Sequence, residues 1–90
     1  MPEEDDGTPA HLRQLDAVVV DLILANLRTI DLGYGTKLEI DAFAQTRTIH
    51  DGRRVLYLLR FDAAKATFPE YAEMIAAAID ELETILPTGD

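Results

Sequence analysis

The sequence predicts an α+β fold in which two helices cover a long antiparallel β-hairpin, and three observations lead to that prediction. Apolar residues recur every three or four positions over residues 9–30 and again over 68–86, which is the spacing of a helix face. Between these segments, residues 36–61 alternate with a period of two, as a strand does. Asp51-Gly52 is typical of a two-residue hairpin turn. The predicted order is therefore helix, strand, strand, helix.

The first helix is expected to begin at Thr8-Pro9, because threonine can cap free amides and proline suits the first helical position. It should end before Leu32-Gly33-Tyr34-Gly35, since glycine readily takes the positive φ of a helix C-terminus. Apolar residues cover more than half of its circumference, and one side is shared by Arg13, Ala17, Asp21, Leu24 and Arg28. Such a helix is either central in the fold or buried against a second copy.

The hairpin is expected to carry apolar side chains on both of its faces. One face combines small residues with large ones and suits a covering helix. The other face stays apolar after the helices are placed, and its large apolar residues are Phe43, Ile49, Leu56 and Leu58. Because a lone two-stranded hairpin is marginal in water, we expect a homodimer with the first helix near its two-fold axis. Its hairpins would either pair edge to edge into a four-stranded antiparallel sheet or stack through this second face.

The second helix is expected from about Phe68 to Leu86, where Pro87 ends it. Thr67-Phe68-Pro69-Glu70 has the spacing of a capping box, which makes Thr67 the expected N-cap. The domain prediction is an acidic disordered tail over residues 1–7, a single domain over 8–87 and a short tail over 88–90.

Composition limits the classes of partner. The chain has 90 residues, 17 Asp and Glu against 8 Lys and Arg, a formal net charge of -9 and no cysteine. Nucleic acids and anionic membranes attract positive patches, so we expect no direct binding to either. The acidic N-terminus and the lack of a long apolar run predict a cytoplasmic protein without a signal peptide or membrane span.

The residues that carry chemistry do not form a recognisable catalytic or metal-binding pattern. Serine and cysteine are absent, and His11 and His50 lack the spacing of metal ligands. Gly33-Tyr34-Gly35 follows a helix, whereas a dinucleotide-binding loop follows a strand. We therefore expect a non-enzymatic protein with no cofactor and no bound metal.

Basic residues concentrate in the predicted hairpin and give two interpretations. A cluster at and near its tip could bind a carboxylate or phosphate of a protein partner; its members are Arg47, His50, Arg53 and Arg54. Alternatively, the arginines pair with acids on the chain's own helices. Asp16 and Asp21 lie on an otherwise apolar helix, and Asp16 is the acid expected to meet an arginine of the hairpin.

These observations favour a small interaction module that binds a protein of unknown identity as an adaptor, chaperone or regulatory subunit. The alternative is an acidic inhibitor, such as an antitoxin or phage anti-defence protein, that imitates nucleic acid. Its functional surface would be the row of acids on the second helix, formed by Glu70, Glu73, Asp80 and Glu81.

Overall fold

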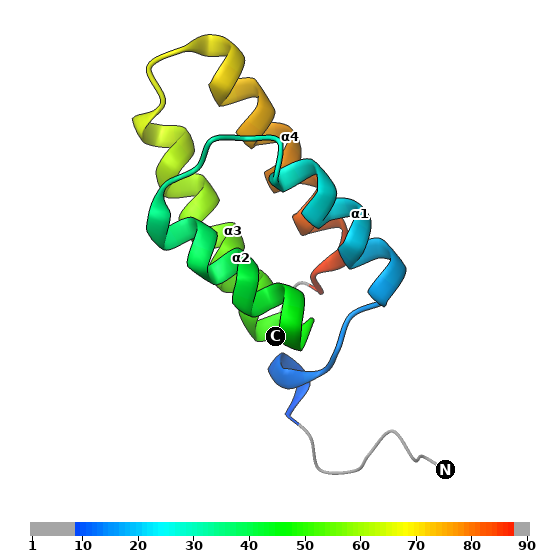
Figure 1. Ribbon diagram of the computed structural model, residues 1–90. Helices are drawn as coiled ribbons and strands as arrows, with labels where there is room; N and C mark the ends of the chain where they lie inside the picture. Colours follow the sequence, from blue (N-terminus) through cyan, green and yellow to red (C-terminus); the bar gives the residue numbers. More distant parts are fainter. Residues whose placement is uncertain (1–8, 88–90) are drawn as a thin grey trace, which may run out of the picture.

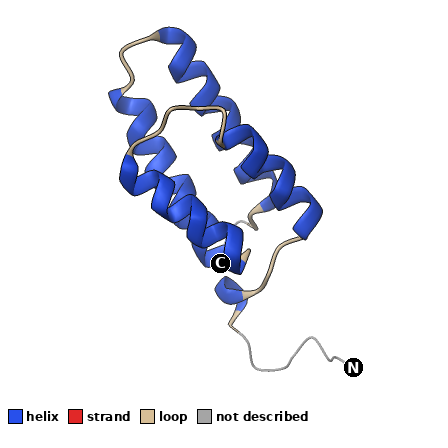
Figure 2. Ribbon diagram, in the orientation of Figure 1, coloured by secondary structure: helices blue, strands red, loops and turns tan. Residues whose placement is uncertain are grey.

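The computed structural model describes residues 9–87, and over this range the chain is all-helical (Figure 2). A 3-10 turn, η1 (Ala10–Leu12), precedes α1 (Ala17–Leu27), α2 (Tyr34–Thr46), α3 (Ile49–Lys65) and α4 (Pro69–Ile85). In the described range no strand forms, and a single isolated bridge pairs Gln14 with Thr48. The prediction of an α+β fold with a β-hairpin is therefore wrong.

The four helices form a ring of neighbours. Helix α1 contacts α2 and α4, and α3 contacts the same two helices from the opposite side. The molecule is elongated, with extents of 50 × 24 × 20 Å, and α2 and α3 run side by side along it (Figure 1). Within residues 9–87, every helix is too short or too polar to span a lipid bilayer.

The segment predicted as a hairpin folds as α2 and α3 because its buried residues have helical spacing. Helix α2 buries Thr36, Ile40 and Phe43, at intervals of four and three residues. Helix α3 buries Ile49, Gly52, Val55, Leu56 and Leu59. A β-period would instead require every second residue to be inside. The four apolar residues predicted on the second hairpin face therefore do not form an exposed face. Phe43, Ile49 and Leu56 lie in the core, and Leu58 is half-buried.

The turn between these helices lies earlier than Asp51-Gly52. Arg47 has a left-handed backbone, with φ 56°, and ends α2. Thr48 is the N-cap of α3, and its hydroxyl accepts a hydrogen bond from the amide of Asp51 at 3.2 Å. Asp51-Gly52 thus occupies the first turn of α3. Glycine suits this position because a Cβ there would lie 3.0 Å from Leu86 and 3.2 Å from Phe43.

The predicted first helix, residues 9–30, is divided into two parts. After η1 the chain extends, and the amide of Leu15 donates to the carbonyl of Arg47 at 2.6 Å. Asp16 then begins α1, accepting hydrogen bonds from the amides of Val18 at 2.8 Å and Val19 at 3.3 Å. Helix α1 ends at Leu27, and Gly33 is the N-cap of α2 rather than a stop signal for α1. The expected start at Thr8 lies outside the described residues, as do the predicted tails.

The second predicted helix is confirmed as α4, whose bounds agree within a residue at each end. Its buried positions include Ile75, Ala78 and Leu82, as the apolar stripe predicted. The capping prediction was wrong, because the N-cap is Phe68 and no side chain caps the helix. Pro69 fills the first helical position, where its missing amide hydrogen costs nothing.

Candidate functional site

The residues predicted at the hairpin tip lie around the α2–α3 junction and point to different parts of the molecule. Arg47 binds Asp21 of α1 at 2.9 Å and also donates to the carbonyl of Ala17 at 2.9 Å. Arg53 donates to the carbonyl of Pro87 at 2.7 Å, beyond the end of α4. The structure therefore does not gather these arginines into one cationic patch.

Arg54 makes a two-pronged ion pair with Glu39 of α2. Its Nε and Nη2 atoms lie 3.0 Å and 2.9 Å from the two carboxylate oxygens. These hydrogen bonds hold the pKa of Glu39 below its usual value, because they favour the charged carboxylate. Arg60 also forms an ion pair, through its Nη2 atom, with Glu83 of α4. The interpretation that arginines pair with the chain's own acids is confirmed for Arg47, Arg54 and Arg60, although Asp21 and not Asp16 is the acid on α1.

The two histidines are brought together by the extended segment before α1. The ring centroids of His11 and His50 are 5.8 Å apart, and the rings are inclined by 65°. The backbone positions them, since the amide of Ile49 donates to the carbonyl of Arg13 at 2.9 Å. No group of three or more His, Asp or Glu side chains suited to a metal ion forms within the described range.

The predicted acidic row lies on the exposed surface of α4. Glu70, Glu73, Asp80 and Glu81 are all exposed. Glu81 accepts hydrogen bonds from the side-chain amide of Asn26 at 3.2 Å to each oxygen, and this contact joins α4 to α1. The carboxylates of the other three residues have no hydrogen-bond or ion-pair partner in the part of the chain that the structure describes.

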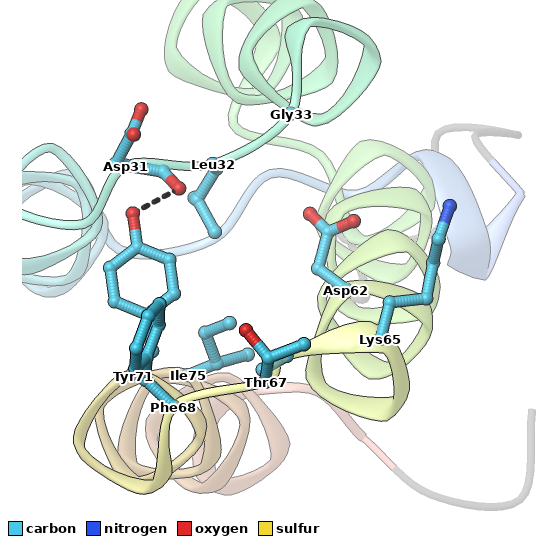
Figure 3. Close-up of a pocket in the computed structure, with 10 residues that line it drawn as sticks. Asp31, Leu32, Gly33, Asp62, Lys65, Thr67, Phe68, Tyr71 and Ile75 are labelled. Atoms are coloured by element: carbon cyan, nitrogen blue, oxygen red, sulfur yellow. Dashed lines mark hydrogen bonds between the residues drawn. The ribbon is translucent and has the colours of Figure 1, made fainter.

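A cavity of about 510 Å³ opens where the α1–α2 loop meets the ends of α3 and α4 (Figure 3). Its apolar lining includes Leu32, Phe68 and Ile75. Tyr71 donates a hydrogen bond from its hydroxyl to the carbonyl of Asp31, and burial raises the pKa of this tyrosine. Sequence reasoning did not find the cavity, because its walls come from segments far apart in the chain.

The charged side chains of this cavity are already engaged within the protein. The carboxylate of Asp62 accepts a hydrogen bond from the hydroxyl of Thr36 at 2.7 Å. Lys65 directs its ammonium away from the cavity (Figure 3), and the nitrogen lies 4.7 Å from the ring centroid of Phe61. The arrangement could hold a small apolar group, and among the described lining residues neither hydroxyl, of Thr67 or of Tyr71, is hydrogen-bonded to a carboxylate that could act as its general base.

The outward face of α1 is apolar, although it faces solvent. Val18 and Leu22 are 69% and 64% exposed, and Ala25 is exposed beside them. These residues are separated by four and three positions, so they share one side of the helix, opposite the buried Val20, Leu24 and Leu27. Leu24, which shares one side of the helical wheel with Asp21 and Arg28, lies in the core.

Neither polar residue of α1 lies on that face. Asp21 is bound to Arg47 on the α2 side, and Asn26 is bound to Glu81 on the α4 side. The apolar face between them is a feature that the sequence signalled, since apolar residues cover most of this helix. Comparison with known protein families, with curated proteins and with solved structures finds no match to the chain.

Proposed function

We propose that this protein is a small, non-enzymatic interaction module that binds another protein through the outward face of α1. The observation that carries the proposal is the exposure of Val18, Leu22 and Ala25 as one continuous stripe. A helix that is apolar on every side is ordinarily buried on every side. In this molecule only the inner side of α1 is covered.

Burial of this face by a partner would supply a substantial binding energy. Covering a Val or Leu side chain fully contributes about 1.5 to 3 kcal/mol relative to leaving it in water. Two such side chains suit the apolar core of an interface, which is surrounded by a polar rim. The polar side chains Asp21 and Asn26 border the stripe and are already held in place, which limits the side-chain entropy lost on binding.

The homodimer predicted from the sequence would need a different interface in this fold. The hairpin face that needed a second copy does not exist in this fold, so the outward face of α1 is now the surface on which a second copy would sit. A second candidate function is the acidic inhibitor, which is supported by the unpartnered carboxylates of Glu70, Glu73 and Asp80. That function would need the acids but not the apolar stripe.

Selection of helical peptides from a displayed random library tests the proposal without knowledge of the natural partner. We expect bound peptides to change the NMR amide shifts of α1, and Leu22→Gln to weaken their binding at least tenfold. Tyr57→Gln is the matched control, because Tyr57 is 70% exposed on α3, away from this face. Peptides that bind Leu22→Gln and the unchanged protein equally well would overturn the proposal.

A further inference from the structure

We propose, resting on the function above, that the partner segment is an amphipathic helix with basic residues beside its apolar stripe, seated along α1 and α4. The apolar stripe would cover Val18, Leu22 and Ala25. The basic residues would meet the carboxylates of α4.

The side of α4 that borders α1 is defined by the contact between Asn26 and Glu81. Residues that share this side follow at helical spacing, and they are Glu70, Met74, Ala77 and Glu81. All four are exposed, and Met74 is 40% exposed. Beside the apolar face of α1 there is thus a second stripe, with apolar residues in its middle and a carboxylate at each end.

The charges that α1 and α4 themselves carry have a single sign. Helices α1 and α4 contain no Lys, Arg or His, and their acids are Asp21, Glu70, Glu73, Asp80, Glu81 and Glu83. Asp21 and Glu83 are paired with Arg47 and Arg60. Of the other four acids, Glu81 is hydrogen-bonded to the uncharged Asn26, and the remaining three have no partner among the described residues. Arg28, just after α1, lies elsewhere, since it lines a separate cavity with Lys37 and Asp41 on the α2 side. A basic segment would therefore approach without meeting a cation of these two helices.

The spacing of the acids suits a partner helix. Glu70 and Glu81 are eleven positions apart, which corresponds to about 16 Å along α4 at the usual rise per residue. Lys or Arg side chains on three successive turns of a parallel or antiparallel helix would cover this length. A second copy of the protein fits less well, because the net charge of -9 on each chain opposes self-association.

Synthetic peptides of defined pattern test the inference by calorimetry and NMR. The probe is a helical peptide of roughly 15 residues with a leucine stripe and lysine elsewhere, compared with the same peptide carrying glutamine in place of lysine. We expect the lysine peptide to bind at least tenfold more tightly, with an affinity that falls as NaCl is raised. Both peptides should change the amide shifts of α1.

Matched variants separate this surface from general attraction to an acidic protein. The double variant Glu70→Gln/Glu81→Gln should weaken binding of the lysine peptide about tenfold. The double variant Asp31→Asn/Asp41→Asn, which removes as many charges from the α1–α2 loop and from α2, should change it less than twofold. Equal losses in the two double variants would overturn the inference. Because all four residues are exposed, we expect both double variants to stay folded. Thermal unfolding of each variant checks this.

The remaining outcomes distinguish failure of the inference from failure of the proposed function. Equal binding of both peptides at α1 would refute the basic partner and leave α1 as the docking face. Binding of the lysine peptide that is lost in Glu70→Gln/Glu81→Gln but unchanged in Leu22→Gln would refute both and favour the acidic inhibitor. Self-association that strengthens with NaCl and disappears in Leu22→Gln would identify a second copy as the occupant and overturn the inference.

Discussion

Asp16 stands between the extended segment and α1, and its side chain decides where the helix begins. The carboxylate accepts hydrogen bonds from two amides of the first turn, which otherwise have no partner inside the helix. Thr48 caps α3 with its hydroxyl, whereas α2 begins at Gly33 and α4 at Phe68 with no side-chain cap. Single polar side chains, of Asp16 and Thr48, therefore mark the starts of α1 and α3, and Pro69 at the first helical position marks the start of α4.

This difference predicts unequal effects of two similar truncations. Asp16→Ala should lower the free energy of unfolding by about 1 kcal/mol, because the first amides of α1 lose their acceptor. Thr67→Ala should change it by less than about 0.3 kcal/mol, since Thr67 is exposed and caps nothing. Urea unfolding of both variants measures the two values. A larger loss in Thr67→Ala than in Asp16→Ala would restore the capping box that the sequence suggested.

At the scale of the elements, the two ends of the chain could be predicted better than the middle. The stripe of α4 is long, regular and followed by Pro87, so periodicity alone identified the helix. Residues 36–61 gave a misleading signal because Asp51-Gly52 matches a hairpin turn in composition. Its flanking residues are compatible with either period over a few positions. The turn at Arg47 has no glycine to mark it, and a left-handed arginine is uncommon.

The candidate site was predictable to the extent that it lies on one element. The unusually apolar circumference of α1 indicated that both its inner and outer sides need a neighbour. The acids of α4 were correctly expected on an exposed surface. The pairing of His11 with His50 and the cavity below the α1–α2 loop depend on packing between distant segments, which periodicity does not report.

Two glycines in the first turns of α2 and α3 give a prediction about these helices. No atom of another part of the molecule lies within 4 Å of a Cβ added at Gly35, so Gly35→Ala should stabilise the protein by about 0.5 kcal/mol through helix propensity. At Gly52 the same Cβ would press on the buried ring of Phe43 at 3.2 Å and 3.3 Å. Gly52→Ala should therefore cost about 1 kcal/mol, because overpacking outweighs the gain in propensity.

Thermal unfolding of the two glycine variants, measured side by side, decides whether α3 approaches α2 as closely as described. A gain of stability in both variants would mean that the space at Gly52 is larger than these distances allow. The comparison is independent of any partner, because Gly52 is buried within the chain.

On the scale of the whole molecule, the cations within the described helices are confined to α2 and α3, whereas large apolar side chains are exposed on all four helices. Helices α2 and α3 contain basic residues that pair with neighbouring acids, as Arg54 does with Glu39. Helices α1 and α4 contribute acids, apolar residues and neutral polar residues such as Asn26 and Thr84 to the surface, but no cation. A small domain has little spare stability, so apolar residues left in water are a cost that a binding role would explain.

The last prediction tests whether the apolar residues of α1 and α4 divide between core and surface as the structure places them. Leu82 is fully buried, and Leu82→Ala should lower the free energy of unfolding by about 2 to 5 kcal/mol through lost burial and a residual cavity. Leu22→Gln should change it by less than about 0.5 kcal/mol, because the side chain is 64% exposed and glutamine is a good helix former. Denaturant unfolding at several protein concentrations measures both. A loss of several kcal/mol in Leu22→Gln that grows with protein concentration would show that the outward face of α1 is already buried against a second copy in the free protein, whereas a loss independent of concentration would place Leu22 in the core of the single chain.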